Sequence, residues 1–292
     1  MKVAILGLGA MGSGIARNAL RVDPTLAVWN RSPAKAEPLI AAGAHAARSP
    51  KAGAEGREIV CTMLADDRAL EAVLAGDEGL LEGLAAGAVH VSMSTISPDT
   101  AAQLETRHRE RGQQFISAPV FGRPEAAAAA KLFVLAAGAP APLERARPLL
   151  EALGQRLFVL GERPAAANLV KLCGNFLILS AIEALAEAMT LAQKGGVARE
   201  QLVEVLTGSL FDCTAYRGYG ASLAQERFRP AGFAAPLGLK DMRLVGQTAE
   251  ALRVPMPLLG VLRDHLLETL ALEGEDIDWS AIGRTIARNG GL

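Results

Sequence analysis

The sequence predicts an α/β protein in which a doubly wound, mostly parallel sheet is followed by a long helix and an all-α region. Short apolar segments alternate with helical patterns over residues 1–162, as in a parallel sheet covered on both faces. A glycine-rich turn joins the first of these segments to the first helical pattern. After about residue 163 no strand pattern recurs. We therefore expect an α/β domain over 1–162, an interdomain helix over 163–194 and an all-α domain over 195–292.

The predicted strands follow one another with helical stretches between them. The first begins at Lys2 and runs into the glycine turn, and the second covers residues 26–32 (LAVWNRS). Further strands are predicted at 58–64, 88–95, 113–120, 131–138 and 156–161. Right-handed crossovers between parallel strands would place helices on both faces of the sheet.

The remainder of the chain is predicted to be helical. Residues 165–196 can form one helix of roughly 28–30 residues, on the order of 45 Å long, which Gly195 and Gly196 would end. Two later segments, 202–210 and 257–272, carry more apolar surface than one small domain needs to cover itself. We therefore expect this half to build a homodimer or homotetramer.

The composition excludes several classes of protein. Half of the 292 residues are hydrophobic and 21% are charged, which is typical of a compact globular chain. The net charge of −1 gives no general electrostatic reason to expect nucleic acid or membrane as a partner. We expect no apolar run of transmembrane length, and a strand at Lys2 leaves no room for a signal peptide.

Cysteine and histidine usage points away from disulfides and metals. The three cysteines lie far apart, and the four histidines form no ligand pattern in the sequence. We therefore expect reduced thiols, no metal site and a cytoplasmic protein.

The motif GLGAMG contains Gly7, Gly9 and Gly12 in the spacing G-x-G-x-x-G, directly after a strand and at the start of a helix. The first glycine permits a tight turn, the second lets a pyrophosphate approach the backbone, and the third allows close packing of the helix. The helix N-terminus then favours the bound anion. The motif predicts a Rossmann-type dinucleotide-binding domain; the alternative is a glycine turn that has lost its ligand.

The end of the second strand indicates which dinucleotide is bound. An acidic residue there would bind the ribose 2′-hydroxyl of NAD, but this chain has Asn30, Arg31 and Ser32. A guanidinium and a hydroxyl can both bind a 2′-phosphate, which predicts NADP (NADPH) in preference to NAD. The alternative is that Arg31 is a solvated loop cation.

Lys171 and Asn175 are four residues apart on the predicted long helix and therefore share a face. A lysine among apolar neighbours is costly to bury unless it has a task or a partner. Burial disfavours the charged form of an amine, so such a lysine could exchange protons near neutral pH. The alternative is that Lys171 extends from a helix edge to water.

Five motifs occur along the chain in the same order as in the β-hydroxyacid dehydrogenases of the 6-phosphogluconate dehydrogenase superfamily. They are GLGAMG, VSMSTISP (91–98), APV-G within 118–122, K-x-x-x-N at Lys171 and Asn175, and LKDM (239–242). The chain thus resembles 3-hydroxyisobutyrate dehydrogenase and the glyoxylate/succinic semialdehyde reductases over nearly its whole length.

The resemblance implies roles for individual residues. Lys171 would be the acid–base group at the substrate oxygen, and Asn175 would help to hold the substrate. Ser94 and Thr95 would lie beside the nicotinamide and the substrate. Cofactor contacts would come from Ala10, Met11, Met63, Leu64 of the segment MLAD (63–66), and Lys240.

The substrate loop departs from the family pattern. The family usually has DAPVSGG, whereas this chain has Ser117, Phe121 and Arg123 in place of the aspartate, the serine and the second glycine, and keeps Gly122. In the family the Ser-Gly-Gly backbone and hydroxyl cradle a substrate carboxylate. Either Arg123 replaces them as a carboxylate ligand, or Phe121 makes the pocket apolar and the substrate is not a simple acid.

These features predict an NADP(H)-dependent oxidoreductase that transfers hydride between nicotinamide and a small hydroxy acid, aldehyde or keto acid. An imine reductase is the alternative: relatives of that type usually have aspartate or tyrosine where Lys171 stands, but the altered loop favours it. A non-catalytic cofactor-binding module is a third hypothesis, which the presence of both Lys171 and Asn175 disfavours.

Overall fold

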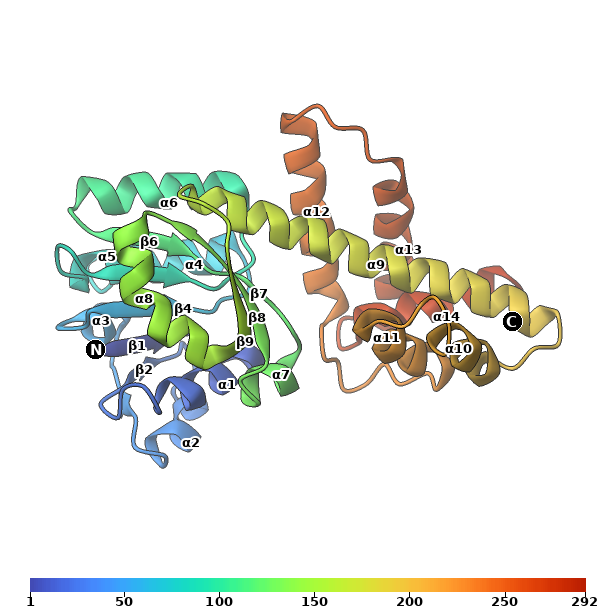
Figure 1. Cartoon of the computed structure of the whole chain (residues 1–292), viewed down its shortest axis with the longest axis horizontal. Helices are drawn as coiled ribbons and strands as arrows, with labels where there is room; N and C mark the ends of the chain where they lie inside the picture. The colour runs from blue at the N-terminus through green and yellow to red at the C-terminus, as the bar shows by residue number, and fades with distance from the viewer. The chain divides into compact units, whose positions relative to one another are not determined.

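The computed structural model describes residues 1–292, and the chain divides into two compact units, Met1–Lys171 and Leu172–Leu292 (Figure 1). The division falls within one helix, α9 (Pro164–Lys194), which contributes residues to both units.

The first unit contains a sheet in the order β3-β2-β1-β4-β5-β6-β8-β7, with β9 paired to β8. Strands β1 to β6 pair in parallel, β8 runs antiparallel to β6 and β7, and β9 is parallel to β8. The predicted, mostly parallel sheet is therefore confirmed. The strands are β1 Val3–Leu6, β2 Ala27–Trp29, β3 His45–Ala46, β4 Ile59–Thr62, β5 Val89–Ser92, β6 Gln114–Ser117, β7 Val120–Phe121, β8 Leu132–Gly138 and β9 Gly154–Val159.

One predicted strand is two strands in the structure. Residues 113–120 were expected to be continuous, but β6 ends at Ser117 and β7 begins at Val120. Pro119 lies between them and has no N–H to donate to a ladder. Its carbonyl instead accepts a hydrogen bond from Leu135 of β8. The chain therefore changes partner at the carboxyl end of β6.

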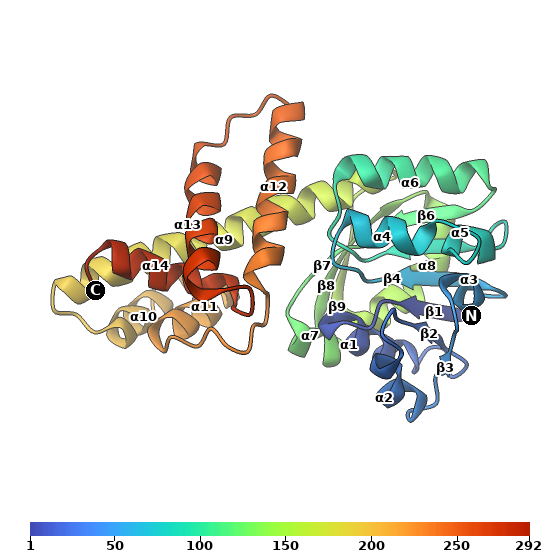
Figure 2. The same cartoon turned by 180° about the vertical axis from the view of Figure 1, so that it is seen from behind.

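Helices cover both faces of the sheet, as expected for a doubly wound domain. Alternate residues of β1 face opposite ways: Val3 and Ile5 join one core with helices α1 and α8, and Ala4 and Leu6 join a second core with α4 and α6. Figure 1 has α8 in front of the sheet, and Figure 2, seen from behind, has α4 and α5 in front. The helical segments are α1 Ala10–Ala19, η1 Pro33–Ala36, α2 Glu37–Ile40, α3 Pro50–Ala54, α4 Asp67–Leu74, α5 Leu80–Gly83, α6 Pro98–Glu110, α7 Pro124–Ala128 and α8 Pro140–Leu153.

The second unit is entirely helical, which confirms that part of the predicted fold. Its core gathers apolar side chains of α9, α12 and α13 around the buried ring of Trp279. Helices α12 and α13 lie side by side in both views. Besides the later part of α9, the segments are α10 Arg199–Thr207, α11 Thr214–Ala224, α12 Ala235–Ala251, α13 Pro257–Glu273, η2 Trp279–Ala281 and α14 Ile282–Asn289.

Helix α9 corrects one expectation. We expected no apolar run of transmembrane length, yet this 31-residue helix is long and apolar enough to cross a membrane by length and composition. The core helix of a globular protein meets the same criteria, and 44% of its most apolar window is buried within the structure.

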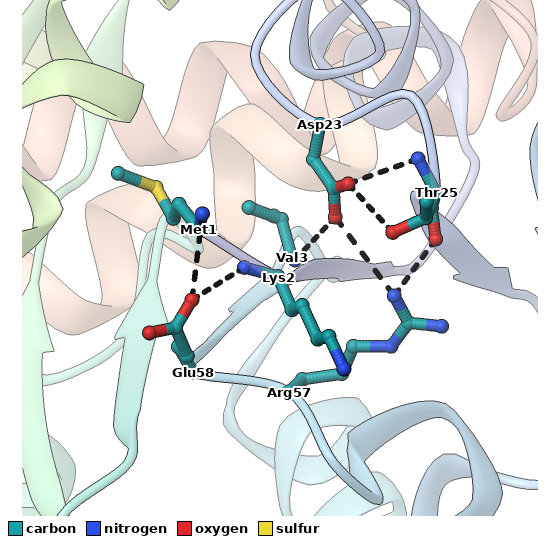
Figure 3. Close-up of polar contacts among 7 residues, drawn as sticks. All are labelled: Met1, Lys2, Val3, Asp23, Thr25, Arg57 and Glu58. Atoms are coloured by element: carbon teal, nitrogen blue, oxygen red, sulfur yellow. Dashed lines mark hydrogen bonds and ion pairs between the residues drawn. The ribbon is translucent and has the colours of Figure 1, made fainter.

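A polar network holds the amino end of β1 (Figure 3). Asp23 accepts hydrogen bonds from the Val3 N–H at 2.7 Å and from the N–H and hydroxyl of Thr25 at 2.9 and 2.7 Å. Arg57 Nη1 lies 3.8 Å from the same carboxylate and donates to the Thr25 carbonyl at 2.7 Å. Burial opposes ionisation of Asp23, but these bonds and the Arg57 charge outweigh it and lower the pKa of Asp23.

Candidate active site

Two glycines of the motif, Gly7 in the turn after β1 and Gly12 in the first turn of α1, have no room for a side chain. Gly7 has a φ of +100°, and a Cβ there would lie 2.3 Å from the carbonyl oxygen of Met63. A Cβ on Gly12 would lie 1.9 Å from the carbonyl oxygen of Gly7. The turn is therefore packed closely against the segment that follows β4, as the first and third glycines of the motif require.

Gly9 differs from these two glycines because it faces open space. A Cβ built on it would meet no atom within 4 Å, and it stands immediately before the first residue of α1, Ala10. No side chain caps this helix, and its first turn contains no acidic residue. Its unpaired N–H groups and the positive end of its dipole can therefore receive an anionic group. Ala10 is exposed and Met11 is half-buried.

The loop after β2 presents a cation and no carboxylate. The Asn30 amide is bound to the backbone, because its oxygen accepts from the Leu8 N–H at 2.9 Å and its nitrogen donates to the Ser32 carbonyl at 3.1 Å. Arg31 and Ser32 themselves are exposed. Asn30 thus joins this loop to the glycine turn, and Arg31 and Ser32 are available to a ligand beside it.

The loops after β4 and β5 are also tied together. The buried Ser94 hydroxyl accepts a hydrogen bond from the Leu64 N–H at 2.9 Å. Met63, Leu64 and Thr95 are half-buried. These predicted site residues all belong to the carboxyl edge of the parallel strands, where open α/β sheets bind ligands.

Asn168, in the first turns of α9, connects that helix to two strand ends. Its side-chain nitrogen donates to the Ser117 hydroxyl at 2.9 Å, and its oxygen accepts from the Ile96 N–H at 3.3 Å. Both Asn168 and Ser117 are fully buried. The start of α9 is therefore held against the ends of β5 and β6.

Lys171 follows Asn168 by one turn of the same helix and is only 8% exposed. Its Nζ lies 4.5 Å from the centroid of the Phe121 ring, which is within the range of a cation–π interaction. The next residue, Gly122, has a φ of +143°, and Arg123 is half-buried at the start of α7. The structure thus brings the ring of Phe121 to the predicted acid–base group.

In the second unit a buried carboxylate joins two predicted site residues. Asp241 is 1% exposed and accepts a hydrogen bond from the Asn175 amide at 2.5 Å. Lys240 Nζ lies 2.7 Å from the other carboxylate oxygen. Asp241 therefore orients the side chains of both Asn175 and Lys240.

Two of the four histidines meet in a buried chain that starts at the end of β4. Thr62 Oγ1 lies 2.9 Å from His90 Nε2, His90 Nδ1 lies 2.9 Å from His108 Nε2, and His108 Nδ1 lies 2.8 Å from Gln113 Oε1. The Gln113 amide nitrogen donates to two backbone carbonyls, so its oxygen is the acceptor in this chain. Burial lowers the pKa of both histidines and so favours neutral rings, in which each histidine donates from Nδ1 and accepts at Nε2.

Family models match both halves of the chain. The NAD binding domain of 6-phosphogluconate dehydrogenase matches residues 2–161, and the NAD-binding domain of NADP-dependent 3-hydroxyisobutyrate dehydrogenase matches residues 165–286. The chain belongs to the β-hydroxyacid dehydrogenase family. It is an NAD(P)-dependent dehydrogenase or reductase of the type that acts on CH–OH groups.

Three individual proteins are similar to this one over nearly the whole chain. An uncharacterized oxidoreductase, YfjR, of Bacillus subtilis is 42% identical over 98% of this chain and 100% of its own. An NAD-dependent L-serine dehydrogenase of Pseudomonas aeruginosa is 33% identical over 94% of this chain and 93% of its own. The structure of 3-hydroxyisobutyrate dehydrogenase from Salmonella typhimurium superposes with a TM-score of 0.87, at 27% identity, over 98% of this chain and 99% of that one.

The similarity extends to proteins with a further region. The cytokine-like nuclear factor N-PAC of Xenopus tropicalis is 32% identical over 97% of this chain, but the match spans 53% of that protein. This chain therefore corresponds to about half the length of that relative.

Sequence reasoning assigned no role to Asn168 or Asp241, and it did not predict the contact between Phe121 and Lys171. Asn168 is a polar residue three positions before Lys171 in an apolar helix, a spacing that places the two on one face. Asp241 stood in the motif LKDM, but only its lysine was assigned a role. The contact between Phe121 and Lys171 had no local signal, because the two residues are far apart in the chain.

Proposed function

We propose that the enzyme prefers NADP(H) and that Lys171 is its general acid and base. The reaction would interconvert a small hydroxy acid, or another small hydroxy compound, with the corresponding aldehyde, ketone or keto acid. The burial of the Lys171 ammonium is the observation that carries the proposal. Burying a cation is costly, and this one stands on a helix that Asn168 holds at the carboxyl edge of the sheet.

The residues at this edge fit a bound dinucleotide. The open space at Gly9 and the uncapped start of α1 would hold the pyrophosphate, and Arg31 and Ser32 would bind the 2′-phosphate. When bound, the nicotinamide supplies or accepts the hydride.

The chain's own residues would then manage charge and protons. Hydride addition to a carbonyl builds negative charge on its oxygen, which the Lys171 ammonium would stabilise before donating a proton to that oxygen. In the reverse direction the neutral amine would accept the hydroxyl proton. Asn175, one turn further along the helix, would orient the substrate through its amide, and Asp241 holds that amide.

The role of Lys171 can be tested with NADPH oxidation against a panel of short semialdehydes, keto acids, uncharged aldehydes and cyclic imines. We expect Lys171→Ala to lower kcat for the best carbonyl substrate by ~10² or more. Lys131→Ala is the matched control, because Lys131 is an exposed lysine immediately before β8. Turnover that is indifferent to Lys171 would contradict the proposal.

The same panel addresses the alternative of an imine reductase. The apolar ring of Phe121 beside Lys171 is the observation that favours it. Turnover of cyclic imines alone, with no carbonyl reduced, would replace the proposed function by that alternative.

We also propose that the enzyme is a homodimer or homotetramer assembled through the helical unit. That unit exposes large apolar side chains, among them Leu191 at 76% and Leu210 at 94%. Burial of such side chains is a general driving force for association. Light scattering that gives the monomer mass at micromolar concentration would remove this proposal.

A further inference from the structure

We propose that Phe121 determines substrate specificity: it favours carbonyl compounds that carry an apolar group on the carbonyl carbon and disfavours those that carry a carboxylate there. The inference rests on the proposed role of Lys171 and narrows the substrate class of the same site.

The backbone fixes the position of the Phe121 ring. Val120 and Phe121 pair with Val134 and Phe133 of β8, and the preceding Pro119 carbonyl accepts the Leu135 N–H at 2.9 Å. A strand pairing of this kind decides the face on which each side chain lies. Phe121 cannot turn to the other face without breaking the pairing.

Gly122, immediately after the ring, has a backbone conformation that suits glycine. Its φ of +143° is a conformation that other residues rarely adopt, and a Cβ there would lie 2.6 Å from a side-chain carbon of Leu132. A side chain at residue 122 would therefore disturb the exit of the chain from β7.

Two contacts then hold α9 and this segment together within the first unit. Asn168 is bonded to Ser117 at 2.9 Å, and Lys171, three residues later on the same helix face, has its Nζ over the Phe121 ring at 4.5 Å. The ring and the ammonium are thus positioned by the fold. Any group bound at the Lys171 ammonium has Phe121 as a neighbour.

The ring's chemistry selects the substituent beside the reacting carbonyl. A phenyl face is electron-rich and attracts a cation but not an anion, and the side chain offers no hydrogen-bond donor. A carboxylate on the carbonyl carbon would be desolvated against the ring, and the ring offers no hydrogen bond to replace those from water. An apolar substituent would instead gain burial against the ring.

The test compares isobutyraldehyde with glyoxylate, in which two carboxylate oxygens replace the two methyl groups on the carbon next to the carbonyl. We expect wild-type enzyme with NADPH to have the higher kcat/KM for isobutyraldehyde. Phe121→Ser should shift the ratio of the two kcat/KM values toward glyoxylate by about tenfold or more, a usual range for one changed pocket contact.

Two further variants make the result specific. Phe121→Leu keeps an apolar wall without a ring, so it should retain the preference for isobutyraldehyde even if Phe121→Ser folds poorly. Phe158→Ser removes a ring that packs on Phe133 and Arg156, and should leave the ratio unchanged. Thermal melting of each variant verifies that it is folded.

The outcomes separate this inference from the proposed function. If turnover depends on Lys171 but Phe121→Ser leaves the ratio unchanged, or wild type already prefers glyoxylate, the specificity role is wrong and the function stands. If wild type reduces neither compound, or reduces them equally well with Lys171→Ala, the proposed function fails and the inference with it.

Discussion

Asn175 donates a hydrogen bond of 2.5 Å to the buried carboxylate of Asp241, and the same carboxylate is paired with Lys240 at 2.7 Å. Two residues that sequence similarity assigns to substrate and cofactor thus depend on a third that has no assigned role. Asp241 is a positioning residue in this arrangement, since it is 1% exposed and acts through its neighbours.

Replacing Asp241 should therefore impair catalysis more than folding. Asp241→Asn removes the negative charge that pairs with Lys240 and leaves one acceptor oxygen for two donors, a cost of about 1–3 kcal/mol, or roughly tenfold to a hundredfold in kcat/KM. Steady-state kinetics should show both a raised KM for the substrate and a raised KM for NADPH. Kinetics at the wild-type level, with a lowered melting temperature alone, would identify Asp241 as purely structural.

Gly9 and Gly12 should respond differently to the same substitution. Gly9→Ala faces open space, so we expect an unchanged melting temperature without cofactor and a weaker affinity for NADPH. Gly12→Ala would place a Cβ 1.9 Å from the Gly7 carbonyl oxygen and should destabilise the fold itself. Calorimetry of the cofactor-free protein and titration with NADPH distinguish the two. Equal effects of both variants on stability would contradict this division of roles.

Arg31 should decide the preference for NADPH over NADH. It is exposed beside the glycine turn, with no carboxylate at residues 30–32 to repel a phosphate. We expect Arg31→Ala to raise the Kd for NADPH by about tenfold, the value of one charge-assisted contact, and to leave the Kd for NADH nearly unchanged. Lys35→Ala, at an exposed position in the adjacent helical turn η1, is a suitable comparison. An equal loss of affinity for both dinucleotides would show that Arg31 does not bind the 2′-phosphate.

The buried histidine pair should make the protein less stable as the pH falls from 7 toward 4. Burial lowers the pKa of His108 to about 4, against 6.5 ordinarily, even though Gln113 opposes the shift, and the Arg107 and Arg111 charges add to it. Burial and the neighbouring His108 also lower the pKa of His90. Between about pH 6.5 and 4 the unfolded chain binds protons that the folded chain does not, so stability is complete above this window and is lost within it.

Each unit of pH in that window should cost about 1.4 kcal/mol for His108 alone. Denaturant unfolding at pH 7, 6 and 5 measures the slope. In His108→Gln, which removes one of the titrating groups, the slope should be smaller, although the variant is less stable at every pH. An identical slope in both proteins would show that other groups set the acid sensitivity. Asp23 acts in the same direction but at lower pH, because its pKa is lowered from 3.8.

Much of the architecture could be predicted from local patterns. The glycine turn, the alternation of strands with helices and the continuous helix Pro164–Lys194 all follow from preferences of neighbouring residues. The error at residues 113–120 came from reading one apolar run as one strand when Pro119 divides it. The expectation that no apolar run reaches transmembrane length was wrong for α9. Polar residues such as Asn168 and Asn175 interrupt this helix, but they carry no charge and its mean hydropathy stays high.

The order of motifs along the chain was enough to determine the family, the dinucleotide-binding turn and the candidate lysine, because each depends on residues close together in sequence. Only the tertiary structure decided which groups support them. Ser94 meets Leu64 across 30 residues, Asn168 meets Ser117 across 51, and Asn175 meets Asp241 across 66. Buried polar groups need hydrogen-bond partners, and the fold supplies them from distant parts of the chain. The periodicity of the sequence does not indicate which residues these partners will be. The contact of Phe121 with Lys171 is of the same kind: the sequence showed a changed loop, and the pairing of β7 with β8 placed its ring.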